Sequence, residues 1–195
     1  MPSQIPVHDF AGIGIGPFNL GLAALTATVP GLQGVFFDTK PQFSWHPGML
    51  LDFSKMQVPF MADLVTGVDP TSSFSYLAYL KKHNRLYQFV ILEDNYITRK
   101  EYAAYCSWVA DQLPALRFGH TVLNVRYLPE QSIYALEVKA GETLLTYHAR
   151  HLVIGIGSSP YTPPGMPPNT TAGIIHSSQY LEHQSKLYQS ASSCN

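Results

Sequence analysis

The first apolar segment of the chain, residues 10–15, is a hydrophobic run interrupted by glycines, which is typical of a buried parallel strand. Pro17 follows at a position favoured for the start of a helix, and residues 20–24 place apolar side chains on one helical face. A second apolar run, which predicts a strand over residues 34–38, ends at Asp38. The order of strand, glycine-rich turn, helix, strand and acid is that of the first βαβ unit of a dinucleotide-binding domain.

Two further segments have the pattern of amphipathic helices. Residues 74–83 have apolar side chains at helical spacing with cations near the end, and Ser72 or Ser73 is a candidate cap. Residues 98–113 begin with the spacing of a capping box and carry a continuous apolar face. Residues 39–59 show little periodicity and contain three prolines, which favours a functional loop.

The second half of the chain changes to a period of two. Alternation over residues 121–148 predicts a small antiparallel meander, and residues 151–157 predict a short buried strand that ends in glycine. This order of elements is that of an FAD-type Rossmann domain of the α/β class, in which a parallel sheet has helices on one face and the β-meander on the other. We expect one domain over residues 1–185, followed by an unstructured tail over residues 186–195.

The glycine-rich turn is the first candidate for a binding site. Glycine at positions 12, 14 and 16 permits a tight turn and lets backbone N–H groups approach a ligand. Those N–H groups and the following helix dipole favour a pyrophosphate, and Asp38 stands where such folds place an acid on a ribose hydroxyl. The GxGxxG pattern is imperfect, because Pro17 or Asn19 occupies its third glycine position, depending on the register. A strand–helix corner without a ligand remains the alternative.

Composition narrows the classes of function. The chain has 195 residues and a formal net charge of −1, so it can bury one core and shows no electrostatic footprint for nucleic acid or an anionic membrane. It contains no run of about 18 apolar residues and no basic start followed by an apolar segment, so we expect a cytoplasmic protein without a membrane anchor. Cys106 and Cys194 have no metal-ligand spacing, and Cys106 fits a small core residue better than a nucleophile.

Three local sequences go beyond a generic nucleotide fold. They read GIGPFNL over residues 14–20, FSWHPGM over residues 43–49 and MQVPFMADL over residues 56–64. In this order they resemble the flavin-dependent lysine and ornithine N-monooxygenases of siderophore synthesis. The glycines at 155 and 157 resemble that family's exit from the first FAD segment. The resemblance covers about residues 7–185.

The resemblance implies FAD as the cofactor, with NADPH and O2 as co-substrates that together convert a primary amine into a hydroxylamine. It implies no catalytic side chain and no metal ligand in this chain. The resemblance and the βαβ pattern together assign cofactor-binding roles to the following residues: Gly12, Gly14, Gly16, Pro17, Asn19 and Leu20 around the pyrophosphate, Asp38, Trp45 and His46 along the adenosine and flavin side, Gln57 at the isoalloxazine, and Val122 at the adenine. For Trp45, a plain core role is an equal alternative.

The sequence departs from this family at the position where the resemblance implies the substrate site. Members that act on amino acids read FLKDL, and their lysine contacts the substrate carboxylate, whereas Ala62 holds that position here. A diamine has no carboxylate, and a lysine would repel its second ammonium by roughly 1 to 4 kcal/mol at about 4 Å. The FMADL form resembles the branch acting on putrescine, cadaverine or diaminopropane. Loss of the lysine in a decaying gene is the alternative.

The sequence also departs from this family in the segments that it contains. Members of the family continue into an NADPH-binding unit and a closing FAD and substrate segment, and no second glycine turn follows residue 185. Three hypotheses follow: the FAD portion of a diamine N-monooxygenase or of a lysine or ornithine enzyme, a non-catalytic flavin-binding fragment, and an NAD-dependent dehydrogenase domain. The last is disfavoured by the segments 43–49 and 56–64. We expect no NADPH-dependent turnover by this chain alone, and the sequence leaves its oligomeric state open.

Overall fold

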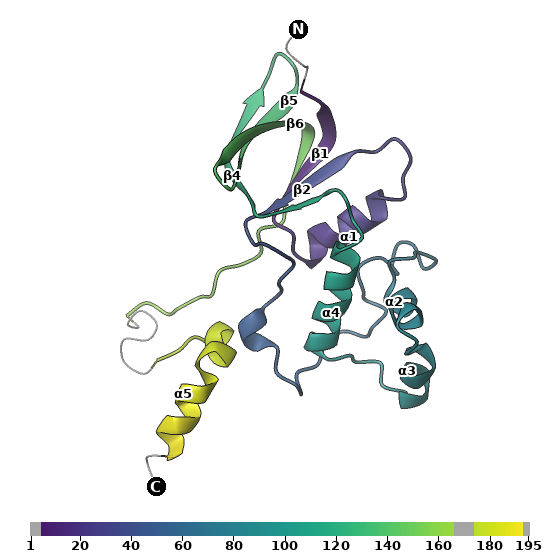
Figure 1. Ribbon diagram of the computed structural model, residues 1–195, viewed down its shortest axis with the longest axis vertical. Helices are drawn as coiled ribbons and strands as arrows, with labels where there is room; N and C mark the ends of the chain where they lie inside the picture. Colours follow the sequence, from purple (N-terminus) through teal and green to yellow (C-terminus); the bar gives the residue numbers. More distant parts are fainter. Residues whose placement is uncertain (1–4, 166–173, 193–195) are drawn as a thin grey trace.

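The computed structural model describes residues 5–165 and 174–192 (Figure 1). Six strands form one sheet in the order β3-β2-β1-β6-β5-β4. The strands are β1 (Val7–Ile13), β2 (Gly34–Asp38), β3 (Leu116–Phe118), β4 (His120–Leu128), β5 (Ile133–Ala140) and β6 (Thr143–Ile154). The helices are α1 (Pro17–Thr26), α2 (Tyr76–Lys82), α3 (Leu86–Leu92), α4 (Arg99–Ala110) and α5 (Tyr180–Ser192), with short 3-10 turns η1 (Pro47–Met49) and η2 (Ser177–Gln179).

Three of the five strand pairings in the sheet are parallel and two are antiparallel, in agreement with the α/β prediction. β1 pairs in parallel with β2 and β6, and β2 pairs in parallel with β3, whereas β4, β5 and β6 form an antiparallel meander. The predicted strand over 151–157 is not a separate element. Residues 151–154 are the end of β6, because residues 143–154 contain no glycine or proline that would interrupt the last meander strand, and residues 155–157 lie beyond the strand. The segment is also not buried as predicted, since Ile154 is 68% exposed.

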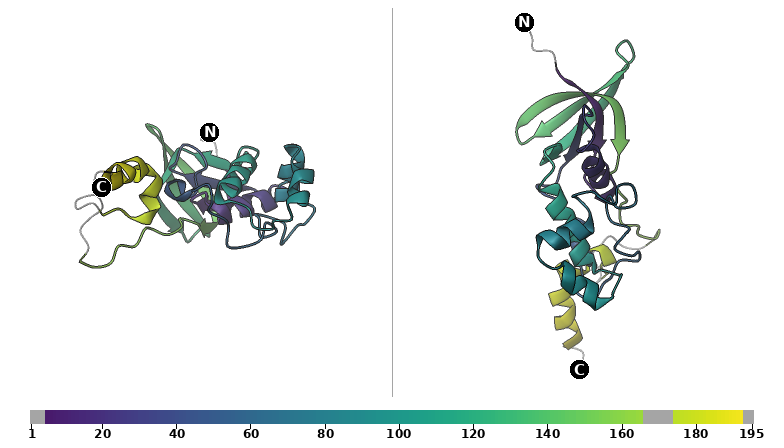
Figure 2. Two further views of the ribbon diagram at one scale, coloured as in Figure 1. Left: turned by 90° about the horizontal axis from the view of Figure 1, so that it is seen from below. Right: turned by 90° about the vertical axis from the view of Figure 1, so that its right-hand side faces the viewer.

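The two faces of the sheet bury separate cores. Helices α1 and α4 cover one face, where Phe36 and Tyr105 are fully buried (Figure 1). On the other face the meander stays hydrogen-bonded to the parallel strands through β6 and curls over them (Figure 2). It thereby buries a smaller cluster that includes Phe37, Leu136 and Val138. The meander therefore supplies the expected third layer as a continuation of the same sheet.

The predicted helix starts agree best with the structure where the N-cap residue forms its hydrogen bond within the predicted helix. α4 begins after Thr98, whose hydroxyl accepts a hydrogen bond from the Glu101 N–H at 3.1 Å, as the capping-box spacing predicts. The cap of α2 is Ser75, which accepts from Ala78 N–H at 3.2 Å, and not Ser72 or Ser73. The Ser72 hydroxyl instead accepts from the Phe74 N–H in the preceding turn, which delays the start of the helix.

The expectation of an unstructured tail from residue 186 is wrong as far as residue 192, because α5 continues to Ser192. Residues 193–195, with Cys194, lie outside the described part of the chain. The segment docks on η1, where a side chain at Gly48 would come within 1.9 Å of the Ser178 carbonyl oxygen. This contact joins residues about 130 positions apart, so the local pattern carried no sign of it.

Cys106 is buried in the core, as predicted, and burial raises the pKa of its thiol to about 12. The thiol therefore stays protonated at neutral pH and has no nucleophilic character. Among the described residues, no helix is both long enough and apolar enough to cross a bilayer.

The Tyr105 hydroxyl links three segments in the helical core. It donates to the Phe74 carbonyl oxygen at 2.7 Å and accepts from the Leu64 N–H at 3.4 Å. We expect Tyr105→Phe to lower the free energy of unfolding by about 1–3 kcal/mol, because a buried carbonyl loses its donor. Urea unfolding measures this change. Tyr127→Phe, at a half-exposed tyrosine of β4, is the control and should leave the midpoint unchanged.

Candidate functional site

A cavity of about 1290 Å³ opens at the carboxyl ends of β1 and β2. This is the place where open α/β sheets bind ligands. The glycine turn and the start of α1 form one wall, and the loop with Trp45 and His46 forms another. Residues 56–64, the start of β4 and residues 155–160 complete the lining.

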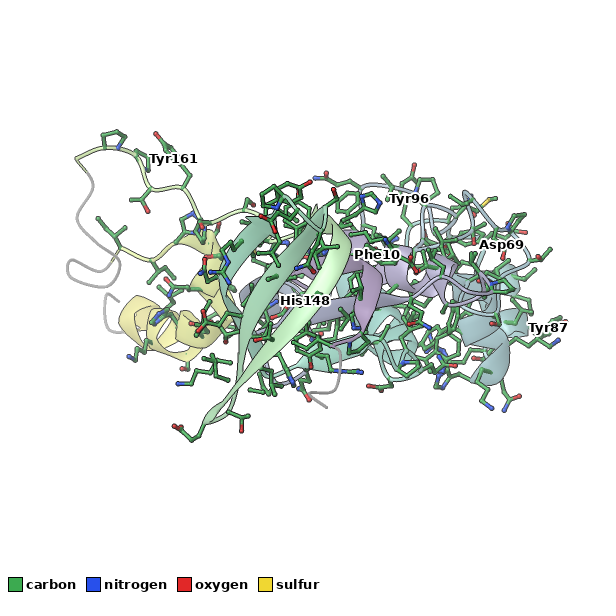
Figure 3. All side chains as sticks on the ribbon, turned by 90° about the horizontal axis from the view of Figure 1, so that it is seen from above. Phe10, Asp69, Tyr87, Tyr96, His148 and Tyr161 are labelled. Carbon is green, nitrogen blue, oxygen red and sulfur yellow. The ribbon has the colours of Figure 1, made fainter. Side chains whose placement is uncertain are left out.

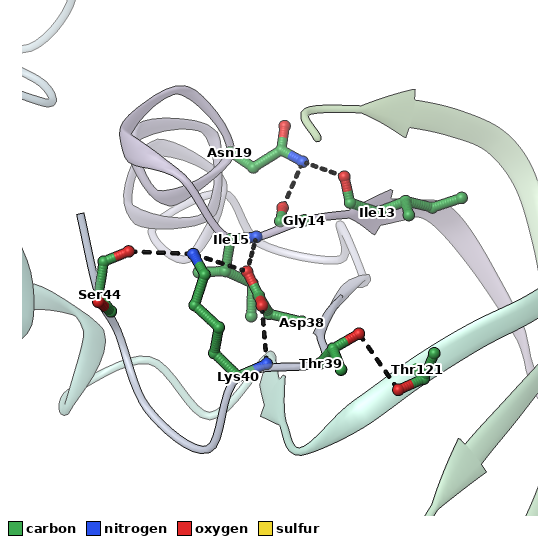
Figure 4. Close-up of polar contacts among 9 residues, drawn as sticks. All are labelled: Ile13, Gly14, Ile15, Asn19, Asp38, Thr39, Lys40, Ser44 and Thr121. Carbon is green, nitrogen blue, oxygen red and sulfur yellow. Dashed lines mark hydrogen bonds and ion pairs between the residues drawn. The ribbon is translucent and has the colours of Figure 1, made fainter. Parts of the chain in front are cut away.

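The glycine turn is held from three sides. Gly14 has a φ of +85°, which favours glycine, and its N–H donates to the Phe37 carbonyl oxygen at 2.8 Å. The Asn19 side chain donates to the Gly14 carbonyl oxygen at 2.7 Å, and the Ile15 N–H donates to Asp38 at 2.9 Å (Figure 4). Asn19 therefore fixes the turn in place of the third glycine of the common motif.

The start of α1 faces the cavity. Gly16, Pro17 and Phe18 all line it, and Phe18 is 94% exposed. The first N–H groups of a helix have no intrahelical acceptor, so those of Phe18 and Asn19 are available at this end. Together with the helix dipole they favour an anion at the cavity wall.

Most of the predicted site residues come together at the cavity. Its lining includes the following: Gly14, Gly16, Pro17, Asp38, Trp45, His46, Ala62 and Val122. Gly12, Asn19, Leu20 and Gln57 are not part of the lining. A side chain at Gly12 would meet the Phe36 ring at 2.1 Å, Leu20 is a core residue with no exposed surface, and Gln57 is solvent-exposed. For all of the predicted residues, those in the cavity lining as well as these four, contact with a cofactor or substrate stays a prediction.

Asp38 has a structural task that its place in the motif did not predict. One carboxylate oxygen accepts from the Ile15 N–H and the other from the Lys40 N–H, both at 2.9 Å. Lys40 extends back over this carboxylate and donates to the Ser44 carbonyl oxygen at 3.0 Å (Figure 4). The acid thus fastens the glycine turn to the following loop. Each carboxylate oxygen retains a lone pair for a ribose hydroxyl.

Trp45 lies between the cavity and the core, so its position agrees with either of the roles that the sequence left open. It lines the cavity, and its ring also packs edge-on against the buried Tyr102 at 5.1 Å between centroids. The Arg99 guanidinium lies 4.5 Å from the centre of the Trp45 ring, a cation–π contact that holds the indole in place. Arg99 was not predicted as a site residue, because nothing in its local sequence indicates a contact with residue 45.

His46 adopts a left-handed backbone conformation with φ of +47°, which is uncommon for a residue other than glycine. Burial, followed by the positive charges of Arg99 and Lys40, lowers the pKa of its imidazole. The ring therefore faces the cavity mainly in its neutral form at neutral pH.

The wall next to Ala62 is held by hydrogen bonds and close packing. The Asp63 carboxylate accepts from the Thr66 N–H at 2.7 Å and from the Tyr76 N–H at 2.6 Å. The Leu64 carbonyl oxygen packs against α1 so closely that a side chain at Gly21 would approach it to 2.8 Å. Asp63 and Leu64 both line the cavity, although neither was predicted to, because their local sequence does not indicate the contacts with Tyr76 and Gly21.

The family model of L-lysine 6-monooxygenase/L-ornithine 5-monooxygenase matches residues 6–193. The chain belongs to this family. It is 46% identical over 184 residues to the putrescine N-hydroxylase of Shewanella oneidensis, and the match covers 93% of this chain and 36% of that protein. It is 39% identical over 171 residues to an L-lysine N6-monooxygenase of Escherichia coli, covering 88% of this chain and 39% of that protein.

Solved structures agree with this placement. The fold matches FAD-bound DfoA of Erwinia amylovora, the cadaverine monooxygenase of desferrioxamine biosynthesis, with a TM-score of 0.90 and 44% identity. That match covers 93% of this chain and 43% of DfoA. The chain therefore spans about two fifths of the length of these family members.

Gly14 and Gly16 should respond differently to substitution by alanine. A side chain at Gly14 would lie 2.5 Å from the Gly155 carbonyl oxygen, in a backbone conformation that other residues avoid. We therefore expect Gly14→Ala to cost at least about 2 kcal/mol of unfolding free energy. At Gly16 the nearest atom is 3.9 Å away, so Gly16→Ala should cost no more than about 1 kcal/mol. Thermal unfolding of both variants checks this, and equal losses would contradict it.

Proposed function

We propose that this chain is the FAD-binding portion of an NADPH- and O2-dependent enzyme that hydroxylates a terminal amine of an aliphatic diamine for siderophore synthesis. The observation that supports it most strongly is the 0.90 TM-score match to FAD-bound DfoA, together with the glycine turn at the cavity. An L-lysine or L-ornithine N-monooxygenase portion is the second candidate, because the family model names those activities.

The residues at the cavity fit a dinucleotide. The N–H groups at the start of α1 suit a pyrophosphate. Gly16 leaves open space beside them, because the nearest atom to a side chain at this position would be 3.9 Å away. The backbone at Val122 and the carboxylate of Asp38 suit the adenosine half, and the half-buried Trp45 ring and the neutral imidazole of His46 suit the flavin half. When bound, the flavin supplies the redox chemistry that transfers an oxygen atom from O2 to the amine.

The chain's own residues position the ring system and limit access of water to it. The Trp45 indole is held by Tyr102 and Arg99, so this wall needs no rearrangement when a ligand binds. Apolar side chains of Met56, Val58 and Leu64 line the cavity beside Ala62 and help to exclude water from the reacting amine. NADPH binding and turnover require the remainder of the family's chain, so we expect no hydroxylamine product from residues 1–195 alone.

Retention of flavin tests the cofactor proposal. The purified chain should be yellow, and Gly16→Val should remain folded but lose bound flavin, because the added methyl groups occupy the space beside the turn. Gly67→Val is the matched control, since no atom lies within 4 Å of its added Cβ and the residue does not line the cavity. Absorbance of the bound flavin and circular dichroism measure the two properties. Equal flavin content in both variants would refute the proposed pyrophosphate position.

Substrate class is tested in a chimera of residues 1–185 with the remaining part of the Shewanella putrescine N-hydroxylase. We expect kcat/KM to favour putrescine or cadaverine over lysine and ornithine. Ala62→Lys should lower kcat/KM for the diamines and raise it for the amino acids about tenfold or more, because a charge-assisted contact with a carboxylate is worth about 1.5–3 kcal/mol. A chimera with Ala62 that prefers lysine or ornithine would favour the second candidate.

A further inference from the structure

The first strand of the meander begins at the cavity. β4 starts at His120, and both His120 and Val122 line the cavity. The Thr121 hydroxyl between them donates to the Thr39 hydroxyl at 3.1 Å (Figure 4). Because Thr39 follows Asp38 in the chain, this bond holds the start of β4 at the end of the cavity where the Asp38 carboxylate lies.

The hydrogen bond of the His120 ring determines which of its nitrogens carries the proton. Nδ1 lies 2.8 Å from the Phe118 carbonyl oxygen, and a carbonyl oxygen can only accept, so Nδ1 is the donor. In the neutral imidazole, Nε2 is then an acceptor. Nε2 forms no hydrogen bond with any of the described residues. The ring also packs against Phe37, at 6.4 Å between centroids, which helps to hold its orientation.

The other polar side chains at this end of the cavity already have partners. The hydroxyls of Thr39 and Thr121 are bonded to each other, and the two carboxylate oxygens of Asp38 each accept a backbone N–H. The remaining lone pairs of Asp38 suit the hydroxyls of a ribose. Among the described side chains at this end, Nε2 of His120 is therefore the acceptor that is left for a base.

We propose that His120 is a specificity-determining residue for adenine, whose exocyclic amino group donates a hydrogen bond to Nε2. The inference rests on the proposed function, in which the adenosine half of FAD lies beside Val122 and Asp38. Adenine presents an amino group at position 6, whereas guanine and hypoxanthine present a carbonyl oxygen there. Such an oxygen and the Nε2 lone pair are both acceptors, so neither finds a donor and the site disfavours these bases.

Two nucleotides that differ in the base test this without any turnover. Calorimetry with the flavin-free chain compares ADP with inosine diphosphate at about pH 8.5, where an ordinary histidine is neutral. We expect the parent chain to bind ADP about tenfold or more tightly, because inosine diphosphate leaves the acceptor of the site unpaired. His120→Phe keeps a ring against Phe37 but has no acceptor. It should bind ADP about threefold to tenfold more weakly and lose most of the preference for ADP.

Two further variants separate the acceptor from a general structural effect. His120→Gln places an amide oxygen near the position of Nε2 and should bind ADP within about threefold of the parent chain. His148→Phe is the matched control, because His148 is a half-buried histidine of β6 that does not line the cavity (Figure 3). It should bind both nucleotides like the parent chain. Circular dichroism checks that each variant is folded.

The outcomes distinguish this inference from the proposed function on which it rests. The same preference for ADP in His120→Phe as in the parent chain would overturn the role of His120, and so would a His120→Gln variant that binds ADP as weakly as His120→Phe. In either case, flavin retained by the parent chain would still support the proposed function. A parent chain that retains no flavin and binds no ADP would overturn both.

Discussion

The left-handed turn at Gly14 is the constraint on which the cavity depends. Its N–H is bound to the end of β2, its carbonyl is bound by Asn19, and the next N–H is bound by Asp38. These bonds bring the start of α1 and the end of β2 to the same edge of the sheet. Gly155 then approaches so closely that a side chain at Gly14 has no room. Main-chain geometry thus places the start of α1, where the helix dipole favours an anion, at the cavity wall.

The sequence allowed prediction of the features that arise from neighbouring residues. The first βαβ unit follows from apolar runs and glycines, and α4 follows from its capping box, because both signals act within a few positions. The meander was visible for the same reason, since alternation marks its strands individually. α3 carried no such signal, because apolar residues on both faces remove the helical period from its sequence.

Features that depend on distant contacts could not be predicted in this way. The indole of Trp45 is fixed by Arg99 and Tyr102, and α5 is placed by the approach of Ser178 to Gly48. The motif assigned Asp38 to a ribose but could not show that it already fastens the turn to the Lys40 loop. The resemblance to a family still allowed residues such as Trp45 to be assigned to the site, because it carries over their positions in relatives. It does not explain which contacts hold them there.

The charge balance beside Ala62 bears on the choice of substrate. Of the two acids in the cavity lining, Asp38 has Lys40 beside it, whereas Asp63 forms no ion pair within the described part of the chain. Backbone N–H groups stabilise the Asp63 carboxylate but do not neutralise it. A lysine at position 62 would offset this negative charge and attract a substrate carboxylate. With alanine there, the wall keeps its net negative charge, which disfavours an amino acid's carboxylate and favours a second ammonium. Ala62 therefore differs from lysine in its effect on the charge of the site as well as on its shape, and both differences agree with the diamine substrate that we propose.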